Sequence, residues 1–284
     1  MSVGWYFLLA AAGLDLLLPF LLAPFYPGYS HRRQVMSVLG SPESPVRWVY
    51  RVWLVALGLL LCAATPDLWA AFGNRSPVLT GLLIAVLCVF ALGAGVLAGL
   101  FSVNADKAVE TAASRIHGVG SVLGFLALAF APLLVALLAF RDGAGGAGVF
   151  SLICFALDVC CFTLFVMADK EAWRGTRLAQ EGTWQRLTLL FMYLPLAVLA
   201  ASQLIQTETT RGRPIWDAPS YYRMMQISPP EPSLMMRWSV SWSLARASSG
   251  MRLSLPFKSS LTSSWKDLPK ILDCQMALVS PSNS

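Results

Sequence analysis

The stretch VLTGLLIAVLCVFALGAGVLAGLF, residues 78–101, decides the fold of this chain. It is continuously apolar, carries no charged side chain and does not alternate as a half-exposed strand does. The hydrocarbon core of a bilayer is about 30 Å thick and is crossed by about 20 apolar residues in helical form. Because lipid offers backbone groups no hydrogen-bond partner, a spanning segment must satisfy its own N–H and C=O groups. We therefore predict a transmembrane helix over this stretch.

Further stretches of the same character lie at residues 5–26, 49–71, 118–140, 147–168 and 184–205. Together they predict an all-α integral membrane protein built as a six-helix transmembrane bundle. The first stretch has no basic residues before it and no small-residue cleavage site after it, so we interpret it as a retained helix rather than a signal peptide. In the second, Thr65-Pro66-Asp67 predicts that the helix ends near Ala64, with Asp67–Phe72 in the membrane interface.

The composition supports a membrane protein. The sequence is 56% hydrophobic and only 13% charged, whereas a soluble domain of this size has about a quarter charged residues. So little charge leaves too little polar surface to cover a globule in water, which makes the lipid bilayer the expected partner. The net charge of +6 is not gathered into a basic stripe with interleaved aromatic residues, so we expect no nucleic-acid partner.

The chain divides into two regions at about residue 211. Residues 1–211 form the predicted six-helix transmembrane domain. Residues 212–284 are rich in Ser, Pro, Met and Trp, show no sustained helical or strand period, and contain no run long enough to span. We predict that this C-terminal tail is disordered, or is an extension that is not homologous to relatives of the transmembrane domain.

Basic residues in the short loops predict the orientation. The loops after the first, third and fifth helices, with their helix boundaries, hold Arg32, Arg33, Arg47, Arg51, Lys107, Arg115, Lys170, Arg174, Arg177 and Arg186. The loops on the opposite side hold only Arg75 and Arg141. Because Lys and Arg are retained on the cytoplasmic side, we predict that loops one, three and five are cytoplasmic and both termini are outside, in a bacterial cytoplasmic membrane.

Small residues recur at helical spacing in the third and fourth stretches. Gly95 and Gly99 form one GxxxG pair, and Gly120 and Gly124 form another. This spacing lets two helices approach closely. We expect these pairs to pack within the bundle rather than in a dimer, because six helices already supply neighbours. The oligomeric state does not follow from the sequence.

No cofactor or metal is expected. Five of the six cysteines lie in apolar runs, where Cys behaves as a small hydrophobic residue, and none belongs to a CxxC or CxxH pattern. The sequence contains no GxGxxG, Walker A or GxSxG motif. With two histidines in all, a three-His zinc site is impossible.

Two acids, Asp15 and Asp158, lie in the middle of apolar stretches. An ionised Asp at the bilayer centre costs about 2.5–3.5 kcal/mol on insertion scales, so intramembrane acids usually serve a function. On the functional interpretation both acids face a polar cavity for a proton, a cation or a lipid headgroup. On the structural interpretation each stays protonated and forms a hydrogen bond to a neighbouring helix.

A second candidate polar site lies in loops one and three, which are predicted on the same membrane face. His31 and His117 lie near helix ends, with Ser30 and Ser37 close to the first in sequence and Asp106 close to the second. A set of His, Asp and Ser at one face suits acid–base hydrolysis, although interfacial His residues are often helix caps or solvated groups. We predict that the two loops meet in one site.

These loops resemble a bacterial family of multi-pass membrane proteins known as domain of unknown function 998. The segment FYPGYSHRRQVMSVLGSPESP at residues 25–45 carries the resemblance. So do Gly99-Leu100-Phe101, then Asp106 and His117-Gly118, and the Gly-x-x-x-Arg entry of GTWQRLTLLFMYLP at residues 182–195. The resemblance covers about residues 5–206 and implies a six-helix bundle with no established activity.

Three functions are consistent with these observations. The favoured one is a non-enzymatic protein that binds a lipid or small amphiphile between its helices. The alternatives are a membrane-embedded hydrolase that uses His117 and Asp106, and a proton- or cation-coupled carrier that uses Asp15 and Asp158.

Overall fold

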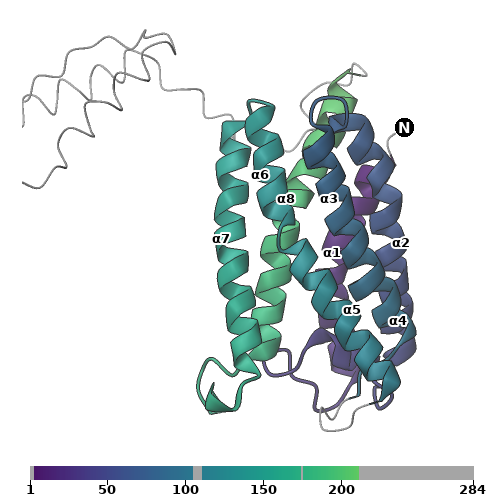
Figure 1. Ribbon diagram of the computed structural model, residues 1–284. Helices are drawn as coiled ribbons and strands as arrows, with labels where there is room; N and C mark the ends of the chain where they lie inside the picture. The colour runs from purple at the N-terminus through teal and green to yellow at the C-terminus, as the bar shows by residue number, and fades with distance from the viewer. Residues whose placement is uncertain (1–2, 105–110, 174, 211–284) are drawn as a thin grey trace, which may run out of the picture. The chain divides into compact units, whose positions relative to one another are not determined.

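The computed structural model describes residues 3–104, 111–173 and 175–210, and every structural statement below concerns these residues. Within them all regular structure is helical and there is no strand (Figure 1). The α-helices are α1 (Gly4–Leu22), α2 (Arg47–Phe72), α3 (Pro77–Phe90), α4 (Ala98–Leu100), α5 (Ala112–Leu128), α6 (Ala131–Arg141), α7 (Gly145–Ala168) and α8 (Glu181–Thr210). Shorter helical segments are η1 (Ala23–Phe25), η2 (Met36–Gly40), η3 (Ala91–Leu97) and η4 (Glu171–Trp173).

The prediction of six membrane-crossing helices is confirmed. The described residues contain six spans that are long and apolar enough to cross a bilayer, namely Gly4–Phe25, Arg47–Phe72, Pro77–Leu100, Ala112–Arg141, Gly145–Ala168 and Glu181–Thr207. The predicted tail at 212–284 lies outside the described residues.

The fourth span begins six residues before the predicted start at residue 118. Thr111 and Ser114 form a capping box in which each side chain accepts a hydrogen bond from the other residue's backbone N–H, at 3.1 and 2.9 Å. The box satisfies two of the amide groups left free at a helix start. A polar first turn is therefore stable here, although hydropathy alone does not indicate it.

The prediction that the second helix ends near Ala64 is wrong, because α2 continues through Pro66 to Phe72. Proline has no N–H, so the carbonyl of Cys62, one turn earlier, loses its usual partner. The Thr65 hydroxyl donates a hydrogen bond to that carbonyl at 2.8 Å. Asp67 connects α2 to α1, because its Oδ2 accepts a hydrogen bond of 2.6 Å from the backbone N–H of Gly4 at the start of α1.

Both GxxxG pairs lie at helix contacts inside the bundle. A Cβ added at Gly95 would lie 2.9 Å from the Cα of Gly58, and one added at Gly120 would lie 2.9 Å from the carbonyl oxygen of Gly93. Gly95 thus allows η3 to pack closely against α2, and Gly120 allows α5 to pack closely against η3. Segment η3 is a single π-helical stretch within the third span, and such stretches often occur at functional sites.

The fourth span is broken between α5 and α6. Pro132 stands in the first turn of α6 and cannot donate to the carbonyl of Leu128, so the two helices are not continuous. They pack on different neighbours: α5 contacts α3 and η3, whereas α6 contacts α3, α7 and α8. Figure 1 shows the result, with α6 alongside α7 and α5 leaning away from α7.

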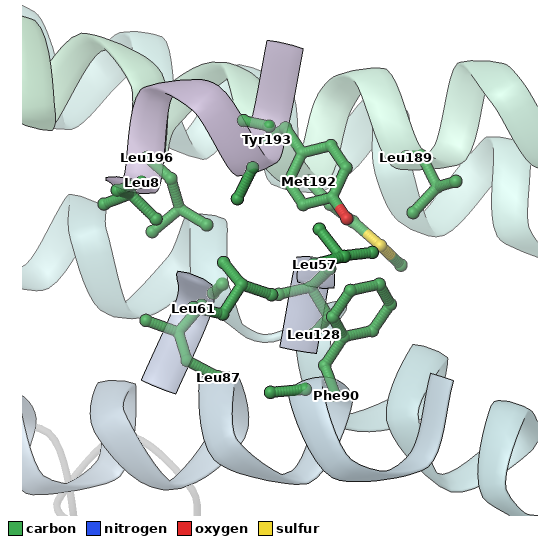
Figure 2. Close-up of a cluster of buried hydrophobic side chains, with 14 of the residues drawn as sticks. Leu8, Leu57, Leu61, Leu87, Phe90, Leu128, Leu189, Met192, Tyr193 and Leu196 are labelled. Atoms are coloured by element: carbon green, nitrogen blue, oxygen red, sulfur yellow. The ribbon is translucent and has the colours of Figure 1, made fainter. Parts of the chain in front are cut away.

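The core lies where α1, α2, α3 and α8 meet (Figure 2). Tyr193 and Phe90 are fully buried there, and their rings meet edge to face with centroids 6.1 Å apart, an arrangement that aromatic quadrupoles favour. Aliphatic side chains fill the space around them, among them Leu8, Leu57, Leu61, Leu87, Leu128, Leu189 and Leu196. The core fixes the relative depth of the helices that form the site.

Candidate functional site

A cavity of about 460 Å³ opens inside the bundle, within the usual range for small-molecule sites of about 300–1,000 Å³. It lies toward the end that holds the C-terminal ends of α1, α4 and α7 and the N-terminal ends of α2, α5 and α8, which we call the odd-loop end. Its lining includes Glu181 at the start of α8 and Leu57, about 15 Å into α2 from Arg47. The cavity therefore extends from the membrane surface to about the middle of a 30 Å hydrocarbon core.

The cavity wall is mainly apolar with a few polar side chains. Leu54, Leu57, Phe90 and Leu189 line its deeper part, and Phe125 and Phe165 line one side. The polar residues that line it are Asp15, Ser37, Tyr50, His117, Ser121, Glu181 and Gln185. Ligand pockets commonly combine an apolar wall with a small number of placed polar groups.

The cavity also opens sideways, between α5 and α7. Val122 and Leu126 on α5 and Val166 on α7 line it and are 57%, 46% and 49% exposed. All three lie within membrane spans, so lipid is the solvent they meet. The ring of Phe125 stacks 6.5 Å from that of Phe162, and these two aromatic side chains bridge the two helices at the opening. The opening connects the cavity to the bilayer interior.

Asp15 lines the cavity and is fully paired. Its Oδ1 accepts a hydrogen bond of 3.1 Å from the Trp53 indole, and its Oδ2 accepts one of 2.9 Å from the Tyr193 hydroxyl. Trp53 and Tyr193 belong to α2 and α8, so the carboxyl joins three helices. Sequence reasoning missed both partners, because each is an aromatic residue with a polar tip and counts as apolar in a hydropathy profile.

Asp158 lies elsewhere and is not among the residues that line the cavity. It is completely buried on α7, between Cys154 and Cys161 on the inward face of that helix. Neither carboxyl oxygen has a hydrogen-bond partner among the described residues. The two intramembrane acids that the sequence singles out thus do not share this cavity.

His117 lies on the cavity wall with a defined orientation. Its Nδ1 is 2.9 Å from the carbonyl oxygen of Phe101 and 3.2 Å from that of Ala98. Both partners are acceptors, so Nδ1 carries the hydrogen and, in the neutral ring, Nε2 keeps its lone pair. Beside it, the Arg51 guanidinium bonds the carbonyls of Gly99 and Leu100, which places a cation at the C-terminal end of the third span.

His31 does not line the cavity. Its ring stacks on Phe20 at 4.6 Å and meets Tyr29 edge-on at 5.4 Å. Burial lowers the pKa of His31, and the positive charge of Arg186 lowers it further. Ser30 also lies away from the cavity, and its backbone N–H donates to the Gln34 side chain.

The part of loop one that lines the cavity is Val35, Met36 and Ser37, and the cavity is also lined by Val103 of loop three and by His117 on α5. Ser37 and His117 thus share the cavity, whereas the two histidines do not. Asp106, the acid predicted to assist His117, lies outside the described residues.

Arg186 on α8 organises loop one, and sequence reasoning did not assign it this role. Its Nη1 donates to the carbonyls of His31 and Gly182, both at 2.7 Å, and its Nη2 donates to the Tyr29 hydroxyl at 2.6 Å. Burial raises the pKa of Tyr29, an effect that the Arg186 charge partly offsets. The Gly-x-x-x-Arg pattern is the sequence feature that points to this role. The glycine is needed because a Cβ on Gly182 would collide with the backbone of loop one, which packs there against α8.

Gln185 completes the attachment of loop one to α8. Its Oε1 accepts a hydrogen bond of 2.7 Å from the backbone N–H of Met36, which holds η2 and Ser37 against the cavity. Among the described residues no group of three His, Cys, Asp or Glu side chains is placed to hold a metal ion. The site is thus a cavity with hydrogen-bonding groups on an apolar wall.

These features define a multi-pass integral membrane protein of six spans with a cavity open to the bilayer. The chain belongs to the family described as protein of unknown function (DUF998), whose profile matches residues 9–202 and so confirms the resemblance seen in the loops. Neither curated proteins nor solved structures yield a match.

Proposed function

We propose that this protein binds a lipid or small amphiphile inside the bundle, in the cavity between α5 and α7. The observation that carries the proposal is the sideways opening, where Val122, Leu126 and Val166 line the cavity and also face lipid. A water-soluble ligand gains nothing from an opening into hydrocarbon. A molecule already dissolved in the bilayer enters through it without crossing water.

The cavity wall has an apolar part and a polar part, as an amphiphile has. The apolar part of the ligand lies among Leu54, Leu57 and Phe90, at the depth of the bilayer interior. Its polar group lies nearer the membrane surface, within reach of Ser37, His117 and Gln185. Depth in the cavity thus matches depth in the membrane for both parts of the molecule.

Polar contacts supply most of the selectivity. Moving an alkyl chain from lipid into an apolar cavity brings almost no hydrophobic gain, because lipid tails are as apolar as Leu side chains. A hydrogen bond in a low-dielectric site is stronger than one in water. The headgroup contacts therefore decide which lipids bind, and the apolar wall decides the length and shape accepted.

Photo-crosslinking tests this proposal. The purified full chain in phosphatidylcholine nanodiscs is exposed to a dodecanol whose chain carries a diazirine, and labelled peptides are identified by mass spectrometry. We expect labels on cavity residues of α2 and α5 that an excess of plain dodecanol removes. Val122→Trp, at the opening, should lower this labelling several-fold.

Leu123→Trp is the matched control, because Leu123 is the next residue of α5, is 55% exposed and does not line the cavity. It should leave the labelling of cavity residues unchanged. Labels confined to lipid-facing residues, insensitive to competitor and to Val122→Trp, would show that nothing binds inside the bundle.

One observation favours hydrolysis as a second candidate function. His117 shares the cavity with Ser37 and Ser121, so a base and two hydroxyls face one space. An alkyl fluorophosphonate distinguishes the two functions, since it captures a serine that an adjacent base activates. A binding protein leaves both serines unlabelled, whereas a hydrolase gives a covalent adduct that His117→Ala abolishes.

A further inference from the structure

We infer that the amphiphile carries a headgroup that donates hydrogen bonds, a hydroxyl or an amine, and that acceptor-only headgroups bind more weakly. This inference rests on the proposed function and specifies the ligand class of that cavity. It follows from the donors and acceptors that the wall presents.

The first element is the orientation of His117. Its Nδ1 is turned to the carbonyls of Ala98 and Phe101, so the nitrogen left for a ligand is Nε2. The hydrogen bonds of the ring to other described residues are both made by Nδ1, and the ring lines the cavity. A neutral imidazole in this tautomer offers the cavity an acceptor and no donor.

The second element is the presence of two carboxyl groups on the same wall. Asp15 accepts one hydrogen bond on each oxygen and, when ionised, retains further lone pairs. Glu181 lies at the entrance from the odd-loop end. An acceptor-only headgroup in this cavity would thus meet further acceptor groups on the wall.

The third element is the hydrogen bonding of the nearest cationic side chains. No Lys or Arg is among the described residues that line the cavity. Arg51 is bonded to the carbonyls of Gly99 and Leu100, and Arg186 to loop one and the Tyr29 hydroxyl. Both guanidinium groups bond other parts of the protein and neither lines the cavity, so neither forms a cradle there for a phosphate or a carboxylate.

The wall has donors of its own, the hydroxyls of Ser37, Tyr50 and Ser121 and the side-chain NH2 of Gln185, whose Oε1 is occupied by the Met36 N–H. Each hydroxyl also accepts and so adapts to a ligand that donates, and an alcohol, which accepts as well as donates, can also pair with the amide. A primary alcohol or a protonated amine satisfies Nε2 of His117 directly. An ether oxygen or a sulfonate cannot donate to Nε2, and a polar group left without a partner in a largely apolar cavity carries a penalty.

Four competitors with the same twelve-carbon chain test the inference in the crosslinking assay. They are dodecanol, dodecylamine, dodecyl methyl ether and dodecanesulfonate. We expect dodecanol and dodecylamine to remove cavity labelling, and the ether and the sulfonate to compete at least tenfold more weakly. Dodecanol and its methyl ether are the decisive pair, because they differ mainly in the donor.

Two variants test the role of His117. His117→Phe removes the acceptor, so the ether should then compete as well as dodecanol does. His31→Phe is the matched control, because His31 does not line the cavity and its ring stacks on Phe20; the preference for dodecanol should persist in it. Thermal unfolding of each variant verifies that it is folded.

The outcomes separate this inference from the proposed function. Equal competition by all four molecules would overturn the headgroup preference and leave binding inside the bundle intact. Failure of every competitor would overturn both. If His117→Phe does not fold, the comparison of dodecanol with its methyl ether on the unaltered chain still tests the headgroup preference.

Discussion

The guanidinium of Arg186 on α8 lies 2.7 Å from the carbonyl oxygen of His31, a residue 155 positions earlier in the chain. This hydrogen bond ties the first loop to the sixth span. It lies on the same side of the bundle as the Met36–Gln185 bond, which holds Ser37 at the cavity wall. The position of one polar group of the site therefore depends on contacts between the two ends of the transmembrane domain.

Gly182→Ala tests this attachment. The added Cβ would meet the carbonyl oxygens of Gln34 and His31, both of them backbone atoms, so loop one must shift and its bonds to Arg186 weaken. We expect a loss of about 1–3 kcal/mol of stability, measured as a lower midpoint of thermal unfolding in detergent. Gly13→Ala is the control, because its Cβ meets nothing within 4 Å and the helix gains about 0.5–1 kcal/mol. Equal midpoints for the two variants would mean that loop one is not held in this way.

The Asp15–Tyr193 bond should appear as an energetic coupling. Tyr193→Phe leaves Oδ2 of Asp15 without its donor, and Asp15→Ala leaves the buried Tyr193 hydroxyl without its acceptor. Each change should cost about 1–3 kcal/mol. Because both remove the same bond, the double variant should cost less than the sum, by about 0.5–3 kcal/mol. A thermal-unfolding cycle of the four proteins gives this value, and strict additivity contradicts the contact.

Asp158→Leu should raise stability rather than lower it. Both carboxyl oxygens are buried without a partner among the described residues, so the side chain carries a desolvation penalty that an apolar residue of similar size avoids. We expect a higher unfolding midpoint, equivalent to about 1–3 kcal/mol. Asp142→Leu is the comparison: its partner Arg75 is 70% exposed at 3.4 Å, and such surface pairs contribute about 0–1 kcal/mol. A lower midpoint for Asp158→Leu would reveal a partner or an ion at that carboxyl.

The orientation prediction is tested by cysteine labelling, in a background without native cysteines. Ser41 in loop one is fully buried and unsuitable for labelling, whereas its neighbour Glu43 is exposed. Glu43→Cys should be protected from a membrane-impermeant maleimide in intact cells, and Gly145→Cys should react, because basic loops are retained in the cytoplasm. Permeabilised cells, in which both sites should label, provide the control. Labelling of Glu43→Cys alone would reverse the orientation.

The hydropathy of the sequence was sufficient to predict all six spans, because lipid requires a continuous run of apolar side chains. It does not record how backbone groups are satisfied. Pro66 therefore seemed to end the second helix, while the Thr65 hydroxyl occupies the carbonyl that the proline leaves free. The polar start at Thr111 was missed for the same reason, since a capping box compensates for its low hydropathy.

The site was harder to predict than the fold. His117, Ser37 and Asp15 were singled out as rare polar groups, and the structure places all three on one cavity. Trp53 and Tyr193 were missed because their apolar bodies conceal the polar atoms that bond Asp15. The cavity is lined by residues of several spans and of loop one, and no residue pattern in a single span indicates an empty space between others.

The break at Pro132 has a consequence for how this family can diversify. Of the two segments of the fourth span, α6 is the one that packs closely on both α7 and α8, whereas α5 packs mainly on α3 and η3 and forms one side of the opening. Substitutions at Ser121, Val122 or Leu126 change the shape and polarity of the entrance, while the α6–α7–α8 contacts that keep the bundle assembled are left as they are. If the cavity binds an amphiphile as proposed, the entrance is formed by α5 and the attachment to α7 and α8 by α6, so ligand preference can change while those attachments are kept.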